Sequence, residues 1–160
     1  MMSCDTLVPM NNSNTAADTE EWRLLYGAYA LLRKETERAL APWQTTVAQA
    51  HVLAVLDVTG RPLPVTELAR VMLQESPSVT RLVDRMSIRG LVKRLDDPSD
   101  RRRSLVAATD KGKEILEEVR RPANETSNGA FGVLSQRERA TLRRLLRKFG
   151  EAARERVGVT

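Results

Sequence analysis

The chain is poor in the residues that build disulfide frameworks, zinc sites and aromatic cores. Its 160 residues include one cysteine, Cys4, and one histidine, His51. An intrachain disulfide and a zinc site rich in cysteine and histidine are therefore excluded. Aromatic residues make up 4% of the sequence, so the core must be built from leucine, valine, alanine and methionine. We expect no metal and no cofactor.

Long apolar runs and enzyme motifs are also missing. No stretch of about 18 apolar residues exists to span a membrane, and residues 1–5 do not begin a signal peptide. The sequence contains no phosphate-binding glycine loop and no G-x-S-x-G turn. The paired carboxylates Glu117 and Glu118 fall within a helical pattern and are interpreted as solvated charges. We therefore expect a cytoplasmic protein that is not an enzyme.

The positive charge of the chain is unevenly distributed. The formal net charge is +5, and residues 76–113 alone hold ten basic and five acidic side chains. The 16 basic and 16 acidic residues outside this window cancel. An excess confined to one quarter of the chain is typical of a surface that faces phosphate groups.

Periodicity and capping signals predict a mainly helical fold with one small β-hairpin. Residues 1–18 lack periodicity and should be disordered. Thr46 and Gln49 form one capping box, Ser135 and Glu138 another. Ser76 should cap its helix, with Pro77 in the first turn, and Pro122 should break or kink another helix. We expect helices over 20–40, 47–59, 65–73, from 76 to 87 or 89, 110–121 and 136–156, and strands over 91–95 and 104–108.

The order helix, tight turn, helix and charged hairpin is typical of a winged helix-turn-helix. The second helix of such a motif enters the major groove of DNA. Arg81 is suited to guanine, and Arg85 and Arg89 to the phosphate backbone. The alternative is a basic face that is only solvated. The remaining candidate contacts at the start of this helix are Ser76, Pro77, Ser78 and Thr80.

The hairpin tip carries the second group of candidate DNA contacts. Arg101, Arg102 and Arg103 are consecutive, and an arginine on a narrow loop can enter the minor groove. Asp100 precedes them and is suited to fix an arginine through an ion pair. The alternative is a solvated turn whose ion pair has little value.

The motifs together resemble the MarR family of bacterial transcriptional regulators. The resemblance rests on Thr66–Ala69, Ser76–Met86, Arg89–Val92, Asp97–Arg102 and Val106–Thr109 with Gly112. It implies a winged helix-turn-helix dimer on a pseudo-palindromic operator, usually in the role of a repressor at the bacterial nucleoid. It also implies that Asp100 orients Arg102 in the minor groove. Two departures are Pro64, where a hydroxyl cap is usual, and Ala108, where leucine is usual.

The flanking helices suggest how the chain is organised and regulated. A compact unit over 46–109 cannot bury both apolar stripes outside it, so residues 19–45 and 110–160 are expected to form a homodimer. The resemblance also implies that a small, often aromatic, ligand releases the protein from DNA. Candidate ligand contacts are Tyr26, Tyr29, Trp43 and His51, which otherwise serve as ordinary packing residues. Two alternatives remain: a redox-responsive regulator that uses Cys4, and a winged helix that binds an acidic protein.

Overall fold

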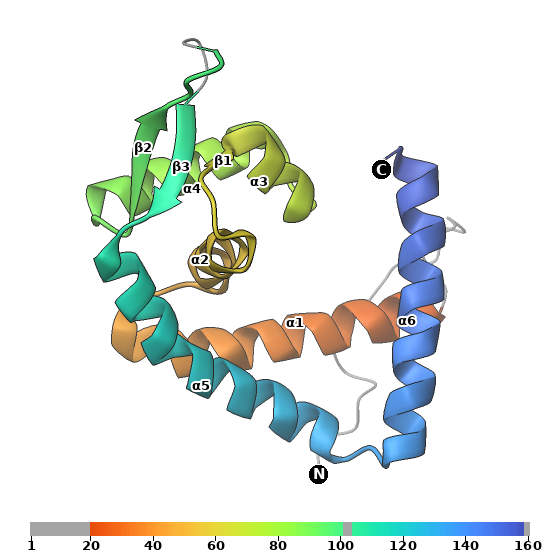
Figure 1. Ribbon diagram of the computed structural model, residues 1–160. Helices are drawn as coiled ribbons and strands as arrows, with labels where there is room; N and C mark the ends of the chain where they lie inside the picture. Colours follow the sequence, from red (N-terminus) through yellow and green to blue (C-terminus); the bar gives the residue numbers. More distant parts are fainter. Residues whose placement is uncertain (1–19, 101–103, 159–160) are drawn as a thin grey trace, which may run out of the picture.

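A computed structural model describes residues 20–100 and 104–158 (Figure 1). The predicted disordered tail, Cys4, Arg101, Arg102 and Arg103 lie outside the described residues. The fold is mainly helical with a small β wing, as the sequence predicted. The elements are α1 (Glu20–Leu40), the 3-10 helix η2 (Ala41–Trp43), α2 (Val47–Thr59), β1 (Leu63–Pro64), α3 (Val65–Val71), α4 (Ser76–Ile88), β2 (Val92–Asp96), β3 (Ser104–Ala108), α5 (Asp110–Gly132) and α6 (Gln136–Val157).

The sheet contains one more strand than the sequence predicted. Its order is β1-β3-β2, with antiparallel pairing throughout. The hairpin register pairs Val92 with Ala108 and Leu95 with Leu105. The expected extended link after α2 contributes β1, in which Leu63 pairs with Val106. This pairing attaches the start of α3 to the wing.

The hydrophobic core lies between α2, α3, α4, the sheet and the start of α5. The inner stripe of α4 is buried as predicted, so its opposite face must point outward. Burying one such side chain contributes about 1.5–3 kcal/mol. The core members with no exposed surface are Val52, Leu53, Leu63, Leu68, Val79, Val83, Met86, Leu91 and Val106.

Both predicted capping boxes are present. The backbone N–H of Gln49 donates to the Thr46 hydroxyl at 3.2 Å, and the backbone N–H of Thr46 donates to the side-chain oxygen of Gln49 at 3.2 Å. Ser135 and Glu138 make the same exchange at the start of α6. The Ser135 hydroxyl and N–H hold the pKa of Glu138 below its ordinary value. At a pH above the ordinary pKa of glutamate, this bonding stabilises the start of α6. The stabilisation is lost as the pH falls through the lowered pKa of Glu138.

Ser76 does not cap α4, contrary to the prediction. A capping residue has an extended backbone, and here Glu75, with ψ 139°, takes that position without a side-chain cap bond. Ser76 is already helical, and its carbonyl accepts the Thr80 hydroxyl at 2.8 Å. Pro77 occupies the first turn as predicted. The first turn of α4 therefore has no side-chain cap.

Of the outcomes predicted at Pro122, the break is wrong, because α5 continues through it to Gly132. An internal proline removes one backbone hydrogen bond and costs about 3 kcal/mol. Packing against α1 and α2 holds α5 in place beside Pro122. The exposed Arg120–Asp57 ion pair of 2.8 Å to α2 adds little to this. The Thr126 hydroxyl donates to the Pro122 carbonyl at 3.0 Å. Tertiary contacts thus outweigh the local signal.

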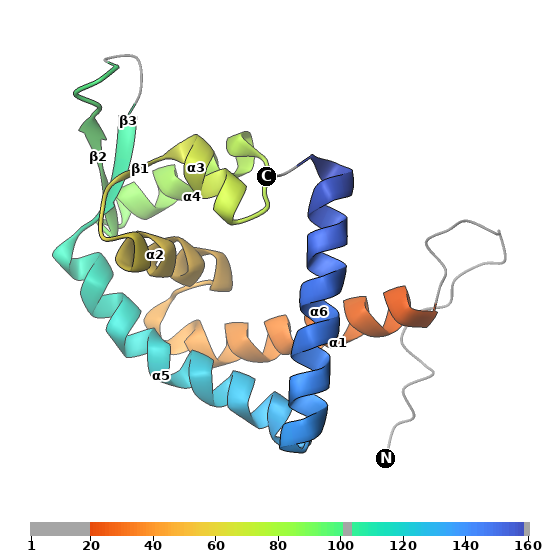
Figure 2. The same ribbon diagram turned by 45° about the vertical axis from the view of Figure 1, so that its right-hand side comes forward.

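The flanking helices α1, α5 and α6 lie outside the winged helix. Helix α5 lies along α1, and α6 then turns back toward the α3 end of the molecule (Figures 1 and 2). No described side chain of α6 is buried. Within the described ranges, no helix is both long and apolar enough to cross a bilayer.

Candidate nucleic-acid interface

Helices α3 and α4 form the predicted helix-turn-helix. Leu68 and Ala69 of α3 are buried against the core. The turn passes through Leu73, whose φ of 52° is left-handed, and the Gln74 N–H donates to the Ala69 carbonyl at 3.0 Å. The turn therefore starts α4 at a fixed angle across α3.

The outer face of α4 presents most of the predicted DNA contacts. Pro77, Ser78, Arg81 and Arg85 are exposed. Arg81 and Arg85 are one turn apart and lie on the same face, and neither has an ion-pair partner among the residues that the structure describes. Thr80 is half-buried, and its hydroxyl proton is used within the helix. Of the predicted hydroxyl contacts, Ser78 is the exposed one, and Ser76 is half-buried.

The wing is fastened to α4 by an ion pair that the sequence analysis did not predict. An Nη of Arg94 on β2 lies 2.7 Å from an Asp84 carboxylate oxygen on α4, and its other Nη donates to the Ser104 hydroxyl on β3 at 2.9 Å. An exposed ion pair adds little stability. It does neutralise the one carboxylate that stands between Arg81 and Arg85.

Hydrogen bonds to Asp97 organise the turn at the start of the wing tip. This side chain is buried, and one oxygen accepts the Ser99 N–H at 2.9 Å and the Ser99 hydroxyl at 2.6 Å. The Asp100 N–H donates to the Asp97 carbonyl at 3.3 Å, which closes a turn. Asp100 is half-buried. Because Arg102 is outside the described residues, its pairing with Asp100 stays a prediction.

Arg89 does not lie where the phosphate-contact prediction placed it. Its Nη1 donates to the Gln44 carbonyl at 2.6 Å and to the Gln49 side-chain oxygen at 2.9 Å. Its Nη2 donates to the Trp43 carbonyl at 3.4 Å. The guanidinium thus points back toward the α1–α2 connection. Nothing in a helical wheel distinguishes it from Arg85.

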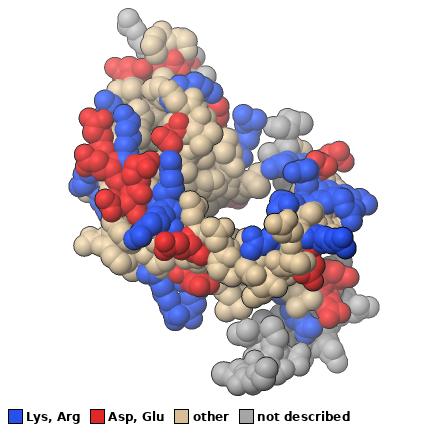
Figure 3. Space-filling model, turned by 60° about the horizontal axis from the view of Figure 1, so that its bottom comes forward, with Lys and Arg blue, Asp and Glu red and all other residues tan. Residues whose placement is uncertain are grey.

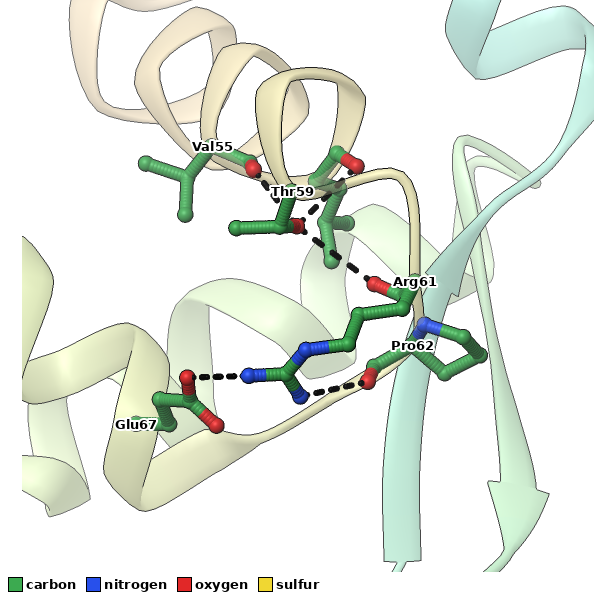
Figure 4. Close-up of polar contacts among 6 residues, drawn as sticks. Val55, Thr59, Arg61, Pro62 and Glu67 are labelled. Atoms are coloured by element: carbon green, nitrogen blue, oxygen red, sulfur yellow. Dashed lines mark hydrogen bonds and ion pairs between the residues drawn. The ribbon is translucent and has the colours of Figure 1, made fainter.

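The start of α3 is held by a polar cluster instead of a cap (Figure 4). Pro64 offers no side-chain cap, as its chemistry requires. The Thr59 hydroxyl at the end of α2 donates to the Val55 carbonyl at 2.8 Å. Arg61 follows and forms a 2.6 Å ion pair with Glu67 on α3. The cluster links α2 to α3, so the departure at Pro64 leaves the motif intact.

The predicted ligand contacts are distributed over α1, η2 and α2. Tyr26 and Tyr29 are 56% and 60% exposed, Trp43 is half-buried, and His51 is exposed. Tyr26 stacks on Trp22 with ring centres 6.0 Å apart. A half-open cavity of about 310 Å³ between α2, β3 and α5 is lined by other side chains, among them Leu53, Leu56, Ala107, Ala108 and Leu116. The aromatic ligand site therefore stays a prediction.

A second basic segment escaped the sequence analysis. Residues 136–157 hold eight basic and three acidic side chains, an excess of five that was hidden when all charges outside 76–113 were summed together. Within residues 20–100 and 104–158, none of these cations has an ion-pair partner. Figure 3 shows basic side chains gathered over α6. A running charge count along the sequence would have found this segment.

Comparison with known proteins identifies the family. The sequence profile described as MarR family matches residues 43–103. The multiple antibiotic resistance protein MarR of Salmonella typhimurium is 32% identical over 128 residues, which cover 79% of this chain and 88% of that protein.

Solved structures agree with this result. A mutant of MarR from E. coli, solved in complex with operator DNA, is 27% identical with a TM-score of 0.78, covering 86% of this chain and 99% of that one. BpsR of Bordetella bronchiseptica, whose DNA binding is regulated by 6-hydroxynicotinic acid, is 26% identical with a TM-score of 0.77, covering 87% of this chain and 98% of that one. The chain therefore belongs to the MarR family of DNA-binding, winged helix-turn-helix transcriptional regulators.

Proposed function

We propose that this protein is a sequence-specific regulator that binds a pseudo-palindromic operator as a homodimer. The observation that carries the proposal is the outer face of α4, where Ser78, Arg81 and Arg85 are exposed while the opposite stripe is fully buried. A helix about 10–12 Å wide fits the major groove, which is about 12 Å wide. The E. coli relative with operator DNA shares this architecture.

The residues of α4 divide into base contacts and backbone contacts. Arg81 projects from the second turn and is proposed to read guanine through two parallel hydrogen bonds. Ser76, Pro77 and Ser78 surround the uncapped N-terminus, whose free N–H and dipole favour a phosphate. Arg85 lies one turn further and is proposed to contact the backbone. Thr80 supports this face, because its hydroxyl is bonded within the helix.

The proposal is tested by selecting duplexes from a random pool with the purified protein and by titrating salt. Neutralising phosphates gives a steep loss of affinity as salt rises. A winged helix that binds an acidic protein instead would select no common duplex sequence. That outcome would remove the proposed function.

The wing is proposed to enter the minor groove through Arg102, with Arg101 and Arg103 on neighbouring phosphates and Asp100 as the orienting carboxylate. Arg102→Ala should weaken operator binding and reduce the salt slope by about one unit per chain. Gel-shift titrations at several salt concentrations measure both quantities. An unchanged affinity and slope would remove the wing from the mechanism.

Dimer formation is proposed from two exposed apolar faces. Trp22 and Tyr29 on α1 are 50% and 60% exposed, and Leu145 and Phe149 on α6 are 49% and 54% exposed. Large apolar side chains that are exposed at helical spacing along one helix indicate an interaction site. A twofold dimer buries both faces and presents two α4 helices about 34 Å apart, one turn of DNA.

Leu146→Glu should dissociate the dimer. Leu146 lies within the apolar stripe of α6 and is 43% exposed in the single chain. An unpaired carboxylate in an apolar interface costs several kcal/mol, so operator affinity should fall with dimer affinity. Sedimentation equilibrium measures the change. Ala140→Glu introduces the same charge on the opposite side of α6, and an equal loss in that control would contradict the proposed interface.

A small aromatic ligand is proposed to release the repressor from DNA. Tyr26, Tyr29, Trp43 and His51 would line its site, which the second copy would help to close. The support is the exposure of these rings and the regulation of BpsR by 6-hydroxynicotinic acid. The ligand must favour one spacing of the two α4 helices over another. Adding 6-hydroxynicotinic acid to the complex of this protein with DNA tests the proposal. The acid should release the DNA.

A further inference from the structure

The C-terminal end of α4 is attached to the connection between α1 and α2. Arg89 donates to the Gln44 carbonyl, the Gln49 side chain and the Trp43 carbonyl at 2.6, 2.9 and 3.4 Å. Gln44 has a left-handed φ of 51°, and Gln49 is buried within the capping box of α2. The acceptors are therefore held in place before Arg89 reaches them.

The same end of α4 is also attached to the start of α5. The Lys111 ammonium donates to the Arg89 carbonyl at 2.8 Å, and the Thr109 hydroxyl donates to the Gly90 carbonyl at 2.6 Å. The Thr109 N–H donates to the Leu91 carbonyl at 3.1 Å. Gly112 packs against that carbonyl so closely that a Cβ would collide with it. Residues 89–91 thus also contact the connection between β3 and α5.

These two connections are the places where the winged helix joins the flanking helices α1 and α5. We infer that Arg89 is a positioning residue, which fixes the angle of α4 relative to α1 and thereby the spacing of the two recognition helices in the dimer. The part concerning spacing rests on the proposed function. The part concerning the angle within one chain does not.

Arginine suits this role because its planar fork directs several N–H donors at fixed angles. Charged hydrogen bonds to three acceptors restrict rotation more than one contact does. Lysine at this position would offer a single nitrogen on a flexible stem. A weaker clamp should therefore leave the fold intact and widen the range of α4 angles.

The angle is measured without DNA by placing nitroxide labels at Lys34 on α1 and Ser78 on α4, both exposed, after Cys4→Ser. Dilution with unlabelled protein restricts the pulsed EPR signal to pairs within one chain. The Arg89→Ala variant should give a distance distribution about twofold broader than that of the parent. An equal width would overturn the inference.

Two variants separate the clamp from stability and from charge. Gln49→Ala removes an acceptor while Arg89 keeps its charge, and it should broaden the distribution as well. Thr46→Ala removes the other half of the capping box and leaves every acceptor of Arg89 in place. Thr46→Ala should lower the melting temperature without broadening the distribution. Broadening by Thr46→Ala equal to that by Gln49→Ala would assign the effect to the cap and overturn the inference.

The spacing is measured with the selected duplex and with a copy that has one extra base pair between the half-sites. That insertion moves one half-site by about 3.4 Å and rotates it by about 35°. The parent protein should lose roughly 10- to 100-fold in affinity, and Arg89→Ala less than about threefold. An equal penalty in both would overturn the spacing role. If the parent selects no duplex, the proposed function fails, while the EPR result still decides the clamp.

Discussion

Gly112→Ala should destabilise the protein by about 2–3 kcal/mol and lower its melting temperature by roughly 5–10 °C. A Cβ at Gly112 would overlap the backbone carbonyl of Leu91 and lie 3.1 Å from a methyl carbon of Leu53. Leu53 has no exposed surface, and the Leu91 carbonyl is bonded to the Thr109 N–H, so neither can easily move. The higher helix propensity of alanine returns at most about 1 kcal/mol. The steric cost therefore prevails.

Thermal unfolding followed by circular dichroism measures the effect, with Gly129→Ala as the control. Gly129 lies in the same helix, is exposed and has nothing within 4 Å of a Cβ position. That substitution should stabilise the protein by up to about 1 kcal/mol. If both variants unfolded at higher temperature than the parent, the close approach of α5 to Leu91 would be contradicted.

The start of α2 was predictable because its signal is local. Thr46 and Gln49 satisfy each other's N–H groups within one turn, and Gly60 ends the helix with a φ of 64°. The predicted range of 47–59 agrees with the observed α2. The same reasoning identified Ser135 as the cap of α6.

Two local signals were misleading. Pro122 disfavours a helix, yet α5 is held by packing against α1 and α2. Ser76 is a good capping residue, yet the extended conformation falls one residue earlier, at Glu75. Neither outcome can be derived from the residues within one turn.

The polar links within the site were not predictable at all. Arg89 and Gln49 are 40 residues apart in sequence, and Arg94 reaches Asp84 only after the hairpin folds back. A helical wheel places Arg85 and Arg89 on one face as equivalent cations. The fold then separates them, since Arg85 stays exposed while Arg89 bonds the backbone behind α4. One acceptor of Arg89 is the backbone carbonyl of Trp43, a proposed ligand contact.

Arg81→Ala should cost about 1–3 kcal/mol of operator binding, which is roughly a 5- to 150-fold loss of affinity, and it should relax base preference. Arg81 is exposed on α4 and has no ion-pair partner within the described residues. Asp84, its nearest carboxylate along the helix, is engaged by Arg94 at 2.7 Å. The guanidinium is therefore available to a guanine edge without losing an internal partner. Selection of duplexes with the variant measures the change in preference.

Two comparisons separate base reading by Arg81 from a general effect of charge. Lys34→Ala removes the same charge from α1, away from α4, and should change affinity only slightly at moderate salt. Arg85→Ala should weaken all duplexes alike, because a phosphate contact carries no sequence information. If Arg81→Ala also weakened operator and random duplex by the same factor, Arg81 would be a backbone contact. The specificity of α4 would then have to come from the shape of the DNA and from the wing.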